Sequence, residues 1–173
     1  MSLTTQFVKL SIGGNIVCIK DFPDIDPKGE IDQIEVTDLC DEYHQYIDGL
    51  KNYADALEFT ANYDESLFNA YGNIGVYNPS TTYAKDDLCE HEGAIYKCNT
   101  ANTTGAWNST KWDAISVELL LCQNASDTTG KNGKFTISKV GVSARLSGAG
   151  VGDVLEMVYI IKPKSAITFS VVA

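Results

Sequence analysis

The sequence predicts a mainly β protein: a β-sandwich or small barrel with one short flanking α-helix, plus a small inserted β-module. Three observations predict this fold class. Apolar and polar residues alternate in several short runs, turn-forming residues separate these runs, and only residues 65–71 have clear helix boundaries. With 173 residues, 44% of them apolar, the chain can bury a core without disulfides or a structural metal.

The N-terminal residues predict a β-hairpin. Apolar and polar residues alternate over 8–12, Gly13 and Gly14 can make the turn, and a second apolar run follows over 16–19. Residues 21–30 read as a turn-rich loop whose aspartates miss the spacing of a calcium-binding loop. The chain begins with no basic segment ahead of an apolar run, so we expect no secretory signal and folding in a cytoplasm.

Two strands and one helix are predicted next. A short strand ends near residue 36, and residues 57–63 alternate strictly between apolar and polar, as a half-buried strand does. Asp64 can cap a helix over 65–71 because its side chain accepts from first-turn amides, and Gly72 permits a left-handed stop.

The acidic side chains gather in one stretch. Residues 21–65 hold 14 acidic and 2 basic residues of a chain whose formal net charge is −10. Within it, residues 37–49 place apolar and aromatic residues at helical spacing but are dense in aspartate, so a helix and an irregular loop both remain open. The charge fits a solvated face that keeps the protein soluble, or an acidic patch that meets a basic one on another copy.

After residue 116 every pattern predicts a strand. The run over 154–161 is apolar on both faces, so a second sheet or a neighbouring subunit is expected to cover its second side. It is also too short, and carries a glutamate, for a membrane span, so no membrane insertion is expected. The predicted strands are 117–122, 135–140, 142–146, 154–161 and 167–172.

Residues 75–116 differ in composition from the rest and predict a small inserted module. The remaining domain is then discontinuous, made of 1–74 and 117–173. Within the module, Glu92 and Gly93 predict a tight hairpin. This turn sets Cys89 opposite Tyr96, whereas a turn one residue later would set Cys89 opposite Cys98, the only register in which a disulfide is possible.

No catalytic or cofactor motif is found. The glycine-rich run 148–153 lacks dinucleotide-loop spacing and leads into a strand. Cys89, His91 and Cys98 lack a fourth ligand at zinc-site spacing, and neither histidine lies in a nucleophile–base signature. We therefore expect no enzyme, no metal and no cofactor. The acidic balance and a single arginine also argue against a surface that holds nucleic acid.

The aromatic residues of the module allow two interpretations. They can be its core, because so small a unit has little else to bury. Alternatively, exposed ring faces can stack on sugars while neighbouring polar groups bind hydroxyls. The candidate glycan-binding residues are Tyr83, Tyr96, Trp107 and Trp112.

Residues 34–39, 46–51, 57–64 and 152–168 resemble the signature runs of major tail tube proteins of phages with long, non-contractile tails. The resemblance covers residues 7–73 and 117–172. It implies hexameric rings that stack into a tube, DNA travelling through the lumen and no catalysis. It also implies a virion protein that assembles in the bacterial cytoplasm, with copies of itself and the tape-measure, tail terminator and distal tail proteins as partners.

On this resemblance, part of the acidic stretch faces the lumen or the next ring. An acidic wall would repel DNA and let it slide without being held. The candidate residues for this wall are Asp38, Asp41, Glu42 and Asp48.

Residues 75–116 resemble a small chitin-binding-type carbohydrate-binding module, through 82–87, 92–97, Trp107 and Trp112. The resemblance implies a module that decorates the outside of the tube. It also supports an alternative function, a carbohydrate-binding adhesin of the tail tip that contacts host surface glycans.

Overall fold

The computed structural model confirms a mainly β fold with one short helix. It describes residues 7–21, 23–25, 30–35, 46–52, 56–101, 103–148 and 154–171. The elements in chain order are β1 (Val8–Ile12), β2 (Asn15–Asp21), β3 (Glu30–Glu35), β4 (Tyr46–Asn52), β5 (Leu57–Asn62), α1 (Glu65–Tyr71), β6 (Leu88–His91), β7 (Ala94–Cys98), the 3-10 turn Ser109–Lys111, β8 (Trp112–Ala114), β9 (Val117–Leu121), β10 (Lys134–Ile137), β11 (Val140–Ser147), β12 (Glu156–Pro163) and β13 (Ile167–Ser170).

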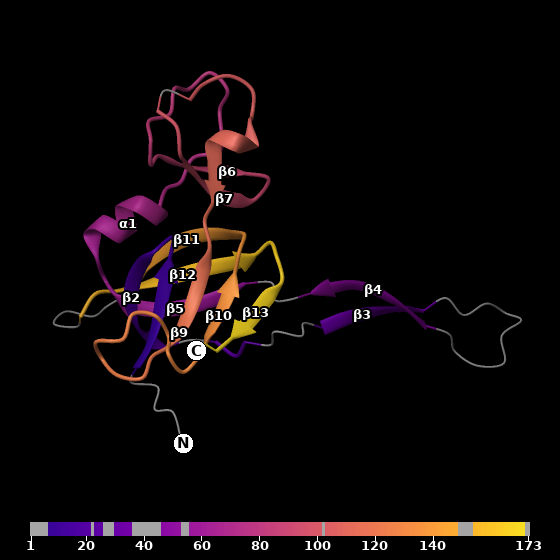
Figure 1. Ribbon diagram of the computed structural model, residues 1–173, viewed down its shortest axis with the longest axis vertical. Helices are drawn as coiled ribbons and strands as arrows, with labels where there is room; N and C mark the ends of the chain where they lie inside the picture. Colours follow the sequence, from indigo (N-terminus) through magenta and orange to yellow (C-terminus); the bar gives the residue numbers. More distant parts are fainter. Residues whose placement is uncertain are drawn as a thin grey trace, which may run out of the picture.

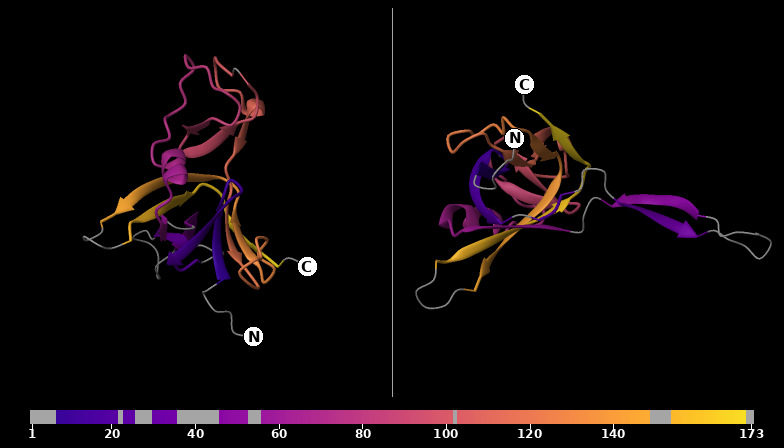
Figure 2. Two further views of the ribbon diagram at one scale, coloured as in Figure 1. Left: turned by 90° about the vertical axis from the view of Figure 1, so that its left-hand side faces the viewer. Right: turned by 90° about the horizontal axis from the view of Figure 1, so that it is seen from below.

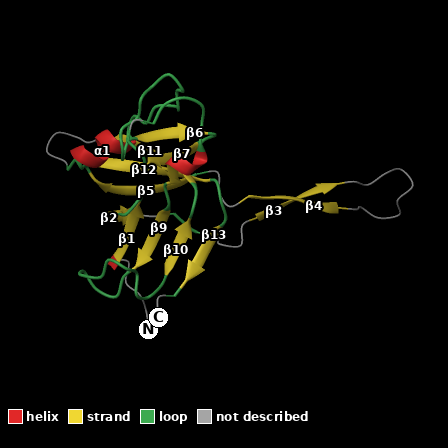
Figure 3. Cartoon of the chain, turned by 45° about the horizontal axis from the view of Figure 1, so that its top comes forward, coloured by secondary structure: helices red, strands yellow, loops and turns green. Residues whose placement is uncertain are grey.

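One eight-stranded antiparallel sheet forms the body, in the order β11-β12-β5-β2-β1-β9-β10-β13. Figure 3 shows that it curls on itself, with β11, β12 and β5 running across one side of β1, β9, β10 and β13. Strand β2 joins the halves, and its register with β5 shifts between Ile19 and Asp21. Such an irregularity bends a strand. Among the described strands, β11 and β13 end the sheet, so the body is an open barrel.

The inner face of the sheet carries the core. Leu57, Phe59 and Ala61 of β5 are buried while their neighbours in sequence are not, which confirms the predicted alternation. Their cross-strand partners in β12, in the same order, are Ile161, Tyr159 and Met157, all fully buried. Burying one such side chain contributes about 1.5–3 kcal/mol.

The predicted N-terminal hairpin and the helix cap are confirmed. Strand β1 pairs with β2 on one side and β9 on the other. Asp64 Oδ1 accepts from the amides of Ser66 and Leu67 at 2.9 and 3.1 Å, capping α1. The predicted left-handed stop is wrong, because Gly72 has a right-handed φ of −76° and its amide donates to the Phe68 carbonyl.

The outward face of β12 is partly covered within the chain. Val158 is buried, although it points away from the core. Arg145 of β11 and Glu58 of β5, which flank β12, form an ion pair of 3.0 Å. Their side chains reach towards each other across β12, so the ion pair covers part of this face. Residues of the module lie opposite another part of it, around Ile160 and Lys162. The expected cover by a neighbouring subunit stays a prediction.

Strands β3 and β4 form a separate two-stranded sheet. Because β4 begins at Tyr46, residues 46–49 are strand, and both interpretations of this part of 37–49 are wrong. Residues 36–45 lie outside the described part of the chain. Figures 1 and 2 show this hairpin, here called the arm (β3 and β4), projecting away from the body. Among the described elements, its only extensive contact is between its own two strands.

Strands β6, β7 and β8 form a third sheet within residues 75–116, which we continue to call the module. Glu92 and Gly93 make the predicted turn, with φ of 52° and 74°. The register pairs Cys89 with Tyr96, and both Cys89 and Cys98 are free thiols. The hairpin therefore has the register in which a disulfide was not expected.

The module is fixed to the body by a close backbone approach. A Cβ added to Gly141 of β11 would lie 2.7 Å from the carbonyl oxygen of Gly93. Ile95 of β7 is 2% exposed and belongs to the main core, together with Tyr71 of α1. The module and α1 thus close one end of the curled sheet, at the top of Figure 1.

We predict that Gly141→Ala weakens this junction, because the new methyl group would collide with a backbone oxygen. The free energy of unfolding, measured in denaturant, should fall by about 1–3 kcal/mol. Gly148→Ala is the matched control, since a Cβ there meets open space. Equal effects of the two substitutions would contradict the proposed close packing.

Candidate functional site

The four candidate glycan-binding residues come together in the module. Tyr83 and Trp112 are buried with Cys89 and Cys98, and Tyr77, Tyr96 and Trp107 pack against them. Two rings lie nearly parallel to that of Trp107: the centroid of His91 is 3.9 Å away and that of Trp112 is 5.3 Å away. Trp107 is therefore partly covered by side chains of the same module.

The other aromatic rings are engaged as well. Tyr77 stacks on Tyr83 at 5.3 Å, and the Tyr83 hydroxyl accepts from the amide of Asn78 at 2.8 Å. The Lys139 ammonium lies 5.5 Å from the centroid of the Tyr96 ring. A hydrogen bond to Tyr96 raises the pKa of Lys139 above its ordinary value. The geometry is that of a small aromatic core with a half-buried rim.

Tyr77 is one of the module's aromatic residues but was not among the glycan-binding candidates, and sequence reasoning missed His91 as a member of this cluster. Tyr77 lies outside the predicted hairpin and reaches the cluster because its amide donates to the Glu90 carbonyl at 2.8 Å. The sequence analysis considers His91 as a metal ligand and as a catalytic base, and not as an aromatic partner of Trp107. Among the residues that the structure describes, no group of three His, Cys, Asp or Glu side chains is placed to hold a metal ion.

Only one of the four candidate acidic residues lies in the described part of the chain. Asp38, Asp41 and Glu42 lie outside the described residues. Asp48 belongs to β4, opposite Gln33 of β3, so it is part of the arm. Their assignment to a lumen or to a ring contact stays a prediction.

The free edge at β13 is apolar along its last residues. Phe169 is 47% exposed and Val171 is 67% exposed. The Phe169 ring packs on Phe135 of β10 with centroids 4.9 Å apart. At the other end of the sheet, Leu146 of β11 and the two residues that precede β12, Val154 and Leu155, are exposed.

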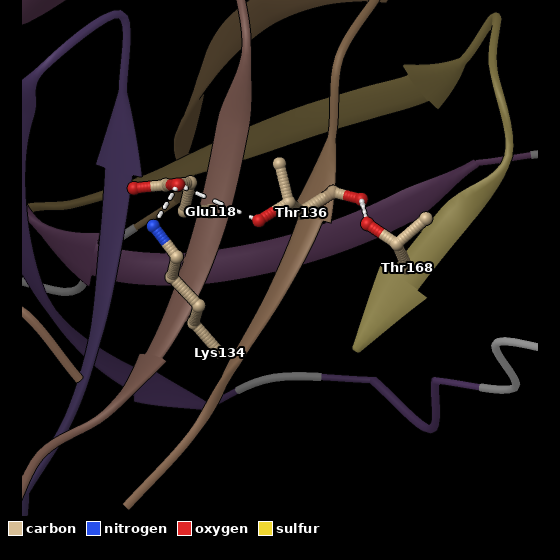
Figure 4. Close-up of polar contacts among 4 residues, drawn as sticks. All are labelled: Glu118, Lys134, Thr136 and Thr168. Carbon is tan, nitrogen blue, oxygen red and sulfur yellow. Dashed lines mark hydrogen bonds and ion pairs between the residues drawn. The ribbon is translucent and has the colours of Figure 1, made fainter. Parts of the chain in front are cut away.

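A polar network on the outer face fixes β13 to the sheet (Figure 4). Lys134 of β10 pairs with Glu118 of β9 at 2.7 Å, and Thr136 donates to the same carboxylate at 3.4 Å. Thr168 of β13 donates to the Thr136 carbonyl at 3.3 Å. These contacts hold β13 against β10 and β9.

Asp127 orders the loop between β9 and β10, at the end of the body opposite the module (Figure 1). Its carboxylate accepts from the amides of Gln123, Thr129 and Lys131 at 2.8–2.9 Å. These hydrogen bonds hold the pKa of the carboxyl well below its usual range. The buried Lys9 ammonium donates to the Asp127 carbonyl at 2.7 Å and so ties the loop to β1.

The described residues include no helix that is long and apolar enough to cross a membrane. No protein-family model matches the chain, and no curated protein matches it.

Solved structures match along almost the whole chain. One is the sheath/tube terminator of PVC, an extracellular contractile injection system, in the extended state. It has 8% identity and a TM-score of 0.56, covering 98% of this chain and 97% of that chain. Another is the tube terminating cap of the anti-feeding prophage, with 10% identity and a TM-score of 0.50, covering 99% and 93%. At these identities the likeness shows a shared fold.

We predict that Asp127→Asn lowers the melting temperature at pH 7, because the folded chain loses a carboxylate whose charged form it favours. A carboxyl group whose pKa is lower in the folded chain stabilises the fold at any pH above its pKa in the unfolded chain, near 3.9. This stabilisation is lost as the pH falls towards the pKa of the folded chain. The difference in melting temperature between wild type and variant should therefore shrink below about pH 4. Thermal unfolding of both proteins from pH 7 to pH 2 measures this difference.

Asp113→Asn serves as the control, since Asp113 is exposed and accepts from the Asn99 side chain at 3.1 Å. A wild-type melting temperature that tracks the Asp127→Asn variant at every pH would refute the role assigned to the carboxylate.

Proposed function

We propose that the chain is a structural subunit of a phage-tail-like particle that forms a ring at the end of the tube. The observation that carries the proposal is the fold that it shares with two tube-terminating proteins over at least 93% of each chain. The role is structural, without catalysis, and places the protein in the virion or particle after assembly in the host cytoplasm.

The open sheet supports ring formation. Strands β11 and β13 end the described sheet, and strand edges that lack a partner pair readily with other chains. The module and α1 contact β11, whereas β13 has an extensive contact only with β10 among the described elements. A contact between unlike edges is heterologous, and such contacts close into rings when the rotation between copies closes. The apolar residues Phe169 and Val171 lie beside one of these edges.

A repeated subunit along the tube is the closely related alternative, as the tail tube resemblance implies. In that role, six copies would form each ring, rings would stack into the DNA conduit, and Asp38, Asp41, Glu42 and Asp48 would face the lumen or the next ring. The partners in either role are further copies, the tube and its terminator or distal proteins, and the tape-measure protein, with DNA passing unheld.

The domain division is part of the proposal. Residues 75–116 would be a module inserted into a ring-forming domain of 1–74 and 117–173. Its own sheet and aromatic cluster support the division. In an assembled ring the module would decorate one end or the outside of the body.

We expect electron microscopy of the purified protein to show single rings for a terminator and stacked tubes for a repeated subunit. Val171→Asp should raise the concentration for half-assembly by roughly tenfold or more, because it buries a charge in the edge contact.

Val76→Asp is the control for this substitution, because Val76 is 72% exposed and lies in the module. A wild-type protein that stays monomeric at every concentration would refute the proposed function.

The second candidate is the tail-tip adhesin, which the gathering of the aromatic residues favours. Because Trp107 is partly buried and stacks on His91 and Trp112 of the same module, we expect negligible retention of the wild-type protein on chitin or glycan beads. Trp107→Ala should behave the same way. Clear retention of wild type, lost in a folded Trp107→Ala variant, would instead support the adhesin.

A further inference from the structure

The arm has no packing partner of its own in the described structure. Its strands β3 and β4 make their only extensive contact with each other. An isolated two-stranded hairpin is marginally stable in water and needs a further surface. Figure 2 shows the described strands of the arm standing clear of the body, and a neighbouring molecule would supply such a surface.

The arm is acidic. Its strands contain four acidic residues and one lysine, counted over 30–35 and 46–52. The register pairs Glu35 with Tyr46 and Gln33 with Asp48, which sets Glu35 and Asp48 at diagonal positions of the ladder. A surface that receives the arm therefore needs positive charge to match these residues.

A cleft of about 260 Å³ lies between the module and the body. Its volume equals that of roughly nine water molecules, enough to admit side chains of a docked strand. Gly93 and Gly141 line part of the cleft and lie against each other. Because they have no side chains, their backbone is accessible to a docked strand.

Two lysines line this cleft. Lys162 and Lys164 line it, both exposed, against one carboxylate, Glu90. Lys164 is positioned by the junction itself, because its amide donates to the Lys139 carbonyl at 2.9 Å and its ammonium lies over Gly93. The described residues form ion pairs at Lys20, Lys97, Lys134 and Arg145, and neither cleft lysine is among them.

We infer that the arm of one copy docks into the cleft between the module and the body of a neighbouring copy. Acidic residues of β3 and β4 meet Lys162 and Lys164, and the arm gains the packing surface that its own chain does not provide. This inference rests on the proposed function, since it supplies a second contact between copies besides the strand edges. It also gives the module a role in assembly.

Chemical cross-linking tests the contact directly. Mixed ¹⁵N-labelled and unlabelled protein is assembled, treated with a carbodiimide that joins carboxylates to amines, and digested for mass spectrometry. We expect half-labelled links from Lys162 or Lys164 to carboxylates within 30–35 or 46–52. Assembled protein whose intermolecular links all lie elsewhere would overturn the inference and leave the ring proposal intact.

Charge reversal tests how much the contact between the arm and the cleft contributes to assembly. The double variant Lys162→Glu/Lys164→Glu should raise the concentration for half-assembly at least tenfold, and Glu35→Lys/Asp48→Lys introduced into the same chain should restore it. Lys85→Glu/Lys131→Glu, with the same change in net charge at two exposed lysines away from the cleft, should have little effect.

The outcomes separate the two proposals. Wild-type assembly that Lys162→Glu/Lys164→Glu leaves unchanged would overturn the docking of the arm alone. A wild-type protein that never assembles would overturn both docking and the ring.

Discussion

The body of this protein depends on a sheet that curls without closing. Strand β2 pairs with both β1 and β5 and so links two halves whose inner faces share one core. The same curl leaves β11 and β13 as free edges of the described sheet. Natural proteins cover, charge or shorten such edges unless another chain pairs with them. Here β13 is short, but Phe169 within it and Val171 after it are exposed apolar side chains that a second chain could cover.

The module and the arm differ in how they relate to the open body. The module closes one end of the sheet, and its aromatic rings pack mostly on one another. Among the described elements, the strands of the arm have an extensive contact only with each other. A subunit with unpaired edges, a projecting hairpin and a cleft beside a rigid module has the features expected of a part that is completed by its neighbours.

Local signals in the sequence predicted the local structure well. The alternation in β5, the Asp64 cap and the Glu92–Gly93 turn depend on neighbouring residues, and all three have the predicted form. Strand β4 was missed because its apolar residues follow no strict period and its partner lies across residues 36–45. The ion pair over β12 and the rings around Trp107 join distant residues, so no spacing reveals them.

The most direct test of the central claim, that the free edges are the contact between copies, is amide hydrogen exchange across a concentration series. If β11 and β13 pair between copies, their amides should exchange more slowly as the protein assembles, while those of the exposed loop tips stay unchanged. Assembly without any added protection of β11 or β13 would contradict the claim.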